Sequence, residues 1–222
     1  MAVKQSVCYP MMKPDSIPLR DFVAEVKAMG YAAIELWKPG DDFSEVVELA
    51  RAHDLTIATI SGHDSLTVGL NDPGQHDRIE AELHATIDAA ANLGIPGLIC
   101  FSGNRREGVS AEASMDATVA GLRRIAPYAE ARGVNLNMEL LNSKIDHPGY
   151  ECDHSAWGLD VCRRVNSPNV KLLYDIYHMQ IMEGDLIRTI RDNIRHIGHF
   201  HTAGVPGRHE IGGDQEINYP AV

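Results

Sequence analysis

The stretch "LLYDIYHMQ", residues 172–180, begins as an apolar run and ends in an acid and a histidine spaced D-x-x-H, Asp175 and His178. A short apolar run of this kind is typical of a buried parallel strand. A strand inside a dry core does not retain a lone carboxylate, because an unpaired buried charge is strongly unfavourable. The stretch therefore predicts a strand whose end opens into an active site.

Similar apolar segments recur along the chain and alternate with helical patterns. The predicted strands are residues 7–10, 33–37, 56–63, 97–103, 134–142, 170–178 and 196–204. The predicted helices between them are residues 18–30, 44–53, 77–94, 112–133, 155–165 and 184–194, where apolar residues recur every three or four positions. Gly30, Gly94 and Gly133 stand where a glycine commonly ends a helix.

This alternation predicts an α/β protein with a parallel sheet, either an open doubly wound sheet or a closed barrel. No G-x-G-x-x-G fingerprint follows the first strand, and polar residues occur at the ends of many strands. Both observations favour a TIM (β/α)8-type barrel. The chain has 222 residues, somewhat fewer than the roughly 250 of a typical barrel. We expect one domain, residues 1–222.

Charge and composition argue against several other classes of protein. Twenty basic and 31 acidic residues give a net charge of -11, which argues against a nucleic-acid partner. No apolar stretch reaches the roughly 18 residues of a membrane span, and the first twenty residues do not resemble a signal peptide. We therefore expect a cytoplasmic protein without a membrane partner. The four cysteines match no zinc or redox spacing and are expected to be reduced.

Polar side chains gather where the predicted strands end. They are Tyr9, Glu35, Trp37, His63, Asp64, Asn104, Glu139, Asn142, Asp175, His178, His199 and His201. Carboxylates and an imidazole on one barrel rim suit a divalent cation, Mn²⁺, Mg²⁺, Co²⁺ or Zn²⁺.

Each candidate ligand also has a purely structural interpretation. Glu139 could pair with an arginine at the rim, Asp175 could cap the following helix, and His201 could be a satisfied core histidine. Those interpretations weaken when the three residues are considered together.

Four segments, "NMELLN", "YDIYHMQ", "GHFHTAGVPGRHE" and "EINYP", resemble the hydroxypyruvate isomerase family, within the xylose isomerase-like TIM barrels that include ketose 3-epimerases. The resemblance covers nearly the whole chain. It implies that Glu139, Asp175 and His201 bind the metal, that Glu139 is also catalytic, and that His178 and Arg208 contact substrate.

The resemblance also implies an activity. A metal-dependent aldose–ketose isomerase would move a proton between neighbouring carbons through an enediolate, and hydroxypyruvate, converted to 2-hydroxy-3-oxopropanoate, is the favoured substrate. The planar guanidinium of Arg208 would anchor its carboxylate. Glu210 follows closely and could belong either to the substrate site or to an exposed loop.

Three alternatives stay open from the sequence. A ketose 3-epimerase or an isomerase of a larger sugar would use the same metal rim, with Trp37 and His63 among its pocket walls. A catalytically inactive barrel that binds a sugar or a partner protein is the second. The third, an abasic-site endonuclease, would need several zinc ions and a basic groove, against which the net charge argues.

One departure from the family pattern concerns the end of the sequence. A second catalytic glutamate is expected on strand eight, roughly twenty residues after "EINYP", and the sequence given ends at Val222. We therefore expect an incomplete barrel that lacks strand eight and the last helices. Its unpaired strand edges would favour contact with another copy, so a homo-oligomer is a further expectation.

Overall fold

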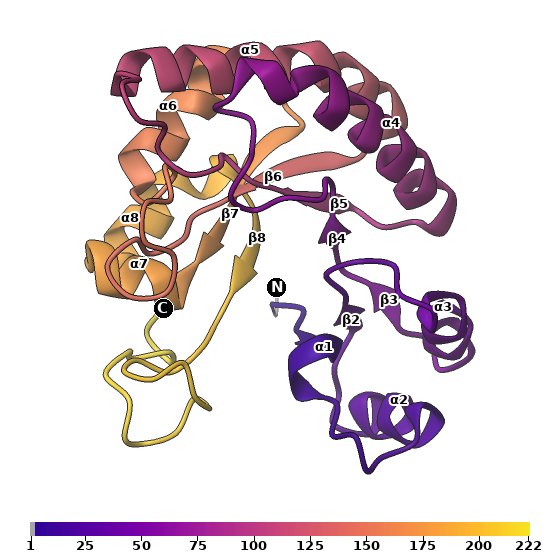
Figure 1. The fold of residues 1–222 in the computed structure, drawn as a ribbon. Helices are drawn as coiled ribbons and strands as arrows, with labels where there is room; N and C mark the ends of the chain where they lie inside the picture. Colours follow the sequence, from indigo (N-terminus) through magenta and orange to yellow (C-terminus); the bar gives the residue numbers. More distant parts are fainter. Residues whose placement is uncertain (1–2) are drawn as a thin grey trace.

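The computed structural model describes residues 3–222, which form eight short strands in two parallel sheets (Figure 1). The first sheet contains β1 (Ser6–Cys8), β2 (Ala33–Glu35) and β3 (Thr56–Ile57), in that order. The second contains β4 (Ile60–Ser61), β5 (Gly97–Cys100), β6 (Asn135–Glu139), β7 (Val170–Asp175) and β8 (Ile197–His201). Within each sheet every strand pairs with its sequence neighbours and all pairs are parallel, so the predicted α/β barrel architecture is confirmed.

Helices separate the strands and lie outside the sheets. They are α1 (Tyr9–Met12), α2 (Leu19–Ala28), α3 (Phe43–Ala52), α4 (His76–Leu93), α5 (Ala111–Arg132), α6 (Ser155–Val165), α7 (Ile176–Met182) and α8 (Leu186–Asn193), with 3₁₀ turns at Pro73–Gln75 and Ile194–His196. The six predicted helices are confirmed within a few residues. Gly94 and Gly133 end α4 and α5 in the left-handed conformation that glycine tolerates best.

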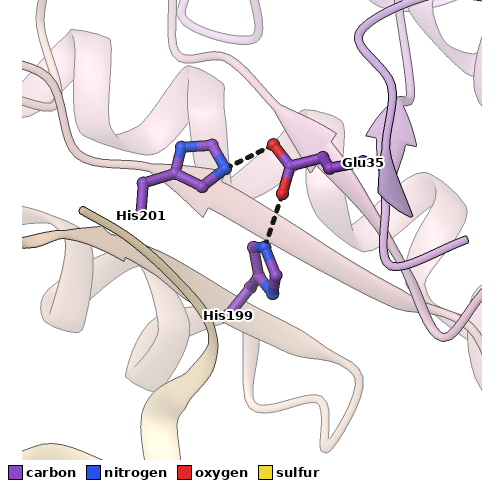
Figure 2. A group of neighbouring side chains, drawn as sticks. All are labelled: Glu35, His199 and His201. Atoms are coloured by element: carbon purple, nitrogen blue, oxygen red, sulfur yellow. Dashed lines mark hydrogen bonds and ion pairs between the residues drawn. The ribbon is translucent and has the colours of Figure 1, made fainter. Parts of the chain in front are cut away.

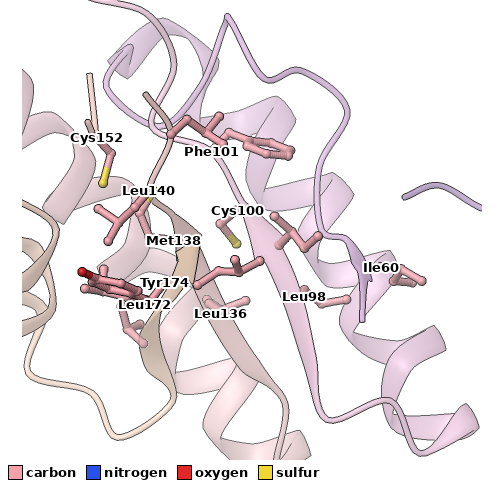
Figure 3. Packing of buried hydrophobic residues seen from close by; sticks show 14 of the residues in the cluster. Ile60, Leu98, Cys100, Phe101, Leu136, Met138, Leu140, Cys152, Leu172 and Tyr174 are labelled. Carbon is pink, nitrogen blue, oxygen red and sulfur yellow. The ribbon is translucent and has the colours of Figure 1, made fainter. Parts of the chain in front are cut away.

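Most of the core lies between the second sheet and helices α4, α5 and α6, which run along its outer side, and the same cluster continues between the first sheet and helices α2 and α3 (Figure 1). Figure 3 shows its aliphatic and sulfur-containing side chains, among them Leu98, Leu136, Met138 and Leu172, all buried. Successive strand residues point to opposite faces. Glu139 therefore points to the other face from Met138, toward the inside of the strand array.

The predicted strand 56–63 is wrong in one respect, because the structure divides it between the two sheets. Ala58 and Thr59 separate β3 from β4. Their backbone groups still bond to the strand before, since Ala58 N–H donates to Ile34 O (2.8 Å) and Thr59 O accepts from Leu36 N–H (3.3 Å). The Thr59 hydroxyl donates to Gly97 O (2.9 Å), which ties the break to β5.

The predicted strand 170–178 also ends earlier than expected. β7 stops at Asp175, and His178 lies in helix α7 rather than in a loop after the strand. The physical reason is a helix cap, because Asp175 Oδ1 accepts a hydrogen bond from the His178 backbone N–H (3.0 Å). Tyr9 likewise begins helix α1 instead of ending a strand.

Candidate metal centre

Glu139, Asp175 and His201 lie together, and each is the last residue of its strand, β6, β7 and β8. Asp175 and His201 are paired in register. His201 Nδ1 is 2.9 Å from Glu139 Oε1 and 3.7 Å from Asp175 Oδ2, and one ligand atom from each residue lies within 4.8 Å of the others. The three residues predicted to bind a metal are therefore close enough to share one ion.

Strand β8 presents both of its inner histidines because it contains one extra residue. Leu172 pairs with Ile197 and Leu173 with His199, which leaves Gly198 as the additional residue of a β-bulge. A Cβ atom at Gly198 would overlap Asn137 Oδ1, so a larger residue there requires the Asn137 side chain to move. The bulge sets the register that brings His199 and His201 to the site.

Glu35 and His199 form a second group around His201 that the sequence analysis did not assign (Figure 2). His199 Nε2 lies 2.9 Å from Glu35 Oε2, and His201 Nε2 lies 2.8 Å from Glu35 Oε1. Glu35 is 3% exposed and comes from β2, in the other sheet. Their positions at strand ends were a usable signal, but nothing in the sequence showed that residues 35 and 199 meet.

The electrostatics of the cluster favour charge on both sides of His201. Burial raises the pKa of Glu35, but the imidazoles of His201 and His199 outweigh it and lower that pKa to about 2. Burial lowers the pKa of His201, yet the Glu35 and Glu139 carboxylates raise it well above its usual range. Burial is also the main reason why the pKa of Asp175 rises to about 6. Without an ion, a protonated His201 neutralises part of the acidic cluster.

Asp175 serves two neighbours at once. Its Oδ1 caps helix α7, so the capping interpretation is confirmed, while Oδ2 faces His201. Because different oxygens are involved, the cap does not prevent Asp175 from binding a metal through Oδ2.

His178 is fully buried and its protonation can be assigned from its neighbours. Asn142 Oδ1 accepts from the backbone N–H groups of Ile145 (3.0 Å) and Asp146 (2.9 Å), so the Asn142 amide nitrogen donates to His178 Nδ1 (2.7 Å). Burial lowers the pKa of His178 to about 3. The ring is therefore neutral, with its proton on Nε2, which has no hydrogen-bond acceptor within residues 3–222.

Arg208 lies near the same site, in the loop after β8. Its guanidinium is over the Tyr177 ring, 5.5 Å from the centroid, and its charge contributes to lowering the pKa of His178. Its backbone φ is 58°, a left-handed value that is uncommon for residues other than glycine.

The other predicted substrate residues make no polar side-chain contact with this cluster in the part of the chain that the structure describes. Trp37 is 45% exposed and Glu210 is also exposed. His63 is buried, where its Nε2 accepts from Phe101 N–H (2.9 Å), and it lines a pocket between β4 and α4 with Lys38 and Glu82. The substrate roles of these three stay predictions.

The residues present fit a divalent ion. Two carboxylate oxygens and one imidazole nitrogen are a common donor set for Mn²⁺, Zn²⁺ or Co²⁺, and three protein ligands leave positions open for substrate. The second nitrogen of His201 already faces a carboxylate, the arrangement usual around a metal-bound histidine.

Comparison with known proteins identifies the family of the chain. The family model described as xylose isomerase-like TIM barrel matches residues 23–222. The chain belongs to this family.

Curated relatives of this xylose isomerase-like chain carry isomerase names. A 2-oxo-tetronate isomerase from Cupriavidus necator is 42% identical over 43% of this chain and 36% of its own length. A putative hydroxypyruvate isomerase from Homo sapiens is 28% identical over 86% of this chain and 73% of its own length. The hydroxypyruvate isomerase of Escherichia coli is 34% identical over 66% and 56%. The chain thus spans less than two thirds of two of these relatives.

Solved structures confirm the barrel fold. The AP endonuclease of family 2 from Brucella melitensis has a TM-score of 0.83 at 24% identity, covering 98% of this chain and 86% of its own. A D-psicose 3-epimerase from Clostridium cellulolyticum has a TM-score of 0.74 at 21% identity, covering 94% and 77%. These identities support a shared fold and carry no argument about activity.

Among the described residues, no helix combines the length and apolar character needed to cross a membrane. The cytoplasmic location, the exclusion of nucleic acid, the formation of a homo-oligomer and the single domain 1–222 stay predictions. The absence of the family's eighth barrel strand also stays a prediction. That strand is not β8, which is the seventh strand predicted from the sequence because the third is divided into β3 and β4.

Proposed function

We propose that this protein is a metal-dependent isomerase of a short 2-oxo hydroxy acid, with hydroxypyruvate as the favoured substrate. The observation that carries the proposal is the convergence of Glu139, Asp175 and His201 beside His178. This neutral imidazole has an Nε2–H donor that makes no hydrogen bond among residues 3–222 and lies 3.7 Å from Asp175 Oδ2. The isomerase names of the curated relatives support the same activity.

Glu139, Asp175 and His201 would hold the ion, which would polarise the substrate carbonyl and make the neighbouring C–H bond more acidic. Glu139 Oε1 faces His201, which leaves Oε2 to accept that proton and to return it to the adjacent carbon. The facing acid/base group would be the second catalytic glutamate that the family resemblance predicts on a barrel strand following β8.

His178 and Arg208 would orient the substrate. The His178 Nε2–H would donate to a hydroxyl or carbonyl oxygen, and the Arg208 guanidinium would pair with the carboxylate that both hydroxypyruvate and 2-oxo-tetronate carry. The left-handed backbone of Arg208 supports a functional role, since such a conformation costs roughly 1 kcal/mol or more and persists mainly where the surroundings require it.

The test measures metal content and isomerisation together. We expect about one Mn²⁺ per chain in the wild type, loss of that ion in Asp175→Ala, and conversion of hydroxypyruvate that depends on the ion. Asp54→Ala, which changes an exposed aspartate after α3, is the matched control. A wild-type protein that binds no divalent ion, or whose ion is unaffected by Asp175→Ala, would refute the proposed centre.

Substrate choice is tested with the same protein. Turnover of hydroxypyruvate and not of D-psicose would support the acid isomerase, whereas 3-epimerisation of the ketose alone would transfer the function to the epimerase alternative. Bound metal without turnover of either substrate would favour a binding protein.

A further inference from the structure

We propose that Glu35 is a positioning residue for the metal centre: it keeps the proton of His201 on Nε2, so that Nδ1 faces the ion. The inference rests on the proposed function, because it assigns a partner to one of the proposed metal ligands. It adds a residue from β2, in the other sheet, to a centre otherwise built from β6, β7 and β8.

Glu35 has only imidazoles as charged partners among residues 3–222. Its two carboxylate oxygens face two different rings, Oε1 toward His201 Nε2 (2.8 Å) and Oε2 toward His199 Nε2 (2.9 Å), as Figure 2 shows. No lysine or arginine in this part of the chain lies within ion-pair distance of it. A buried carboxylate needs compensating partners; His199 forms a hydrogen bond with Glu35, and His201 Nε2 makes a close ion-pair contact with it.

The position of Glu35 then decides which proton His201 loses when an ion binds. Nε2 lies 2.8 Å from a Glu35 carboxylate oxygen, and a nitrogen lone pair this close to an ionised carboxylate would be repelled, so hydrogen stays on Nε2. The neutral imidazole that remains has one hydrogen, which leaves the lone pair on Nδ1. That nitrogen faces Glu139 Oε1 at 2.9 Å and Asp175 Oδ2 at 3.7 Å, where the proposed ion would lie.

His199 holds Glu35 in turn. It lies two residues before His201 on the same bulged strand and approaches the second oxygen of the carboxylate. With one oxygen directed to each ring, the carboxylate of Glu35 cannot rotate without losing a partner. His199 therefore acts on the metal centre through Glu35.

A second ion among Glu35, His199 and His201 is the competing explanation, since these residues also have ligand spacing. It would require both Nε2 atoms to lose their hydrogens and would place two cations on opposite sides of one imidazole. The hydrogen bond from His199 to Glu35 and the close ion pair of Glu35 with His201 account for all three side chains without an ion. The number of ions bound separates the two explanations.

The first experiment titrates Mn²⁺ into the 222-residue protein by calorimetry, using Glu35→Ala, Glu35→Gln and His199→Ala. Removing a carboxylate partner of a metal-bound histidine typically weakens metal affinity about 10–100-fold. We expect a loss of that size in Glu35→Ala, a smaller loss in the isosteric Glu35→Gln, and wild-type affinity in Glu48→Ala, an exposed glutamate of α3. Circular dichroism checks folding, and Glu35→Gln carries the test if the alanine variant does not fold.

The second readout is the tautomer of His201, which a merely structural role of Glu35 would not change. In ¹⁵N-labelled protein loaded with Zn²⁺, long-range ¹H–¹⁵N spectra should show hydrogen on Nε2 and metal on Nδ1. We expect this pattern to become mixed or inverted in Glu35→Ala.

Several outcomes would overturn the inference. Affinity within twofold of wild type in both Glu35 variants, with the tautomer unchanged, would overturn it while leaving the proposed function intact. Two ions in the wild type, one of them lost in Glu35→Ala, would replace the positioning role with a second metal site. A wild type that binds no ion would overturn the inference and the proposed metal centre together.

Discussion

At the scale of single residues, buried histidines distinguish this chain from an ordinary barrel. His63 is 3% exposed, its Nε2 accepts from the Phe101 backbone N–H, and its Nδ1 has no hydrogen-bond partner within residues 3–222. Burial lowers its pKa to about 4. The folded protein therefore keeps His63 neutral at pH values where an exposed histidine takes up a proton.

This difference predicts an acid-dependent loss of stability. Above about pH 6.5, His63 is neutral in both the folded and the unfolded state and contributes no pH dependence. As the pH falls from about 6.5 toward 4, the unfolded state binds the proton first, so the free energy of unfolding decreases by up to roughly 3 kcal/mol; below pH 4 the loss stops growing. Urea denaturation at pH 7, 5.5 and 4.5 measures it.

The matched variants are His63→Gln, whose amide oxygen can still accept from Phe101 N–H, and His53→Gln at the end of α3. Relative to wild type, His63→Gln should become more stable as the pH falls, and His53→Gln should not. Parallel pH profiles for wild type and His63→Gln would contradict the prediction.

At the scale of elements, strand β8 shows how one glycine controls which side chains reach the site. The extra residue at Gly198 changes the alternation, so that His199 and His201 share a face with Asp175 of β7. Asn137 on β6 occupies the space that a side chain at Gly198 would need. Position 198 thus couples the packing of two strands to the metal centre.

We expect Gly198→Ala to lower the free energy of unfolding by about 1–3 kcal/mol through overpacking, and to weaken Mn²⁺ binding by displacing His199 and His201. Shortening the neighbour in the double variant Asn137→Ala/Gly198→Ala should recover part of both losses. Gly213→Ala, where an added Cβ meets no atom within 4 Å, is the control. Additive effects in a double-mutant cycle would show that the two positions do not interact.

The elements also show what the sequence could and could not predict. Strand and helix positions followed from apolar periodicity. Glu139, Asp175 and His201 were among the polar strand ends expected to converge at one rim, and the family resemblance singled them out as metal ligands. The break at Ala58–Thr59 was missed because both halves of the segment are apolar. The pairing of Glu35 with His199 was missed because it joins residues 164 positions apart and depends on the Gly198 bulge, which apolar periodicity does not encode.

At the scale of the whole molecule, the two sheets are joined on one side by the chain itself. Residues 58–59 connect β3 to β4, and the Ser61 N–H donates to Trp37 O (2.7 Å). On the other side, β1 and β8 are the outermost strands of their sheets, and the described residues contain no pairing between them. There, Glu35 reaches from β2 to the histidines of β8.

A bound ion should therefore stabilise the molecule as a whole. An ion that binds only the folded state adds about 2.7 kcal/mol to the free energy of unfolding when its free concentration is 100 times its dissociation constant. We expect saturating Mn²⁺ to raise the melting temperature of the wild type, a chelator to reverse the rise, and Asp175→Ala to show neither change. Equal melting temperatures with and without Mn²⁺ would contradict this expectation.

The contact of Glu35 with β8 has a consequence for regulation. If Glu35 tightens the ion only while β2 lies against β8, then any molecule that binds the first sheet in that closed arrangement shares a coupling free energy with the ion. Thermodynamic reciprocity requires each to strengthen the other by the same factor.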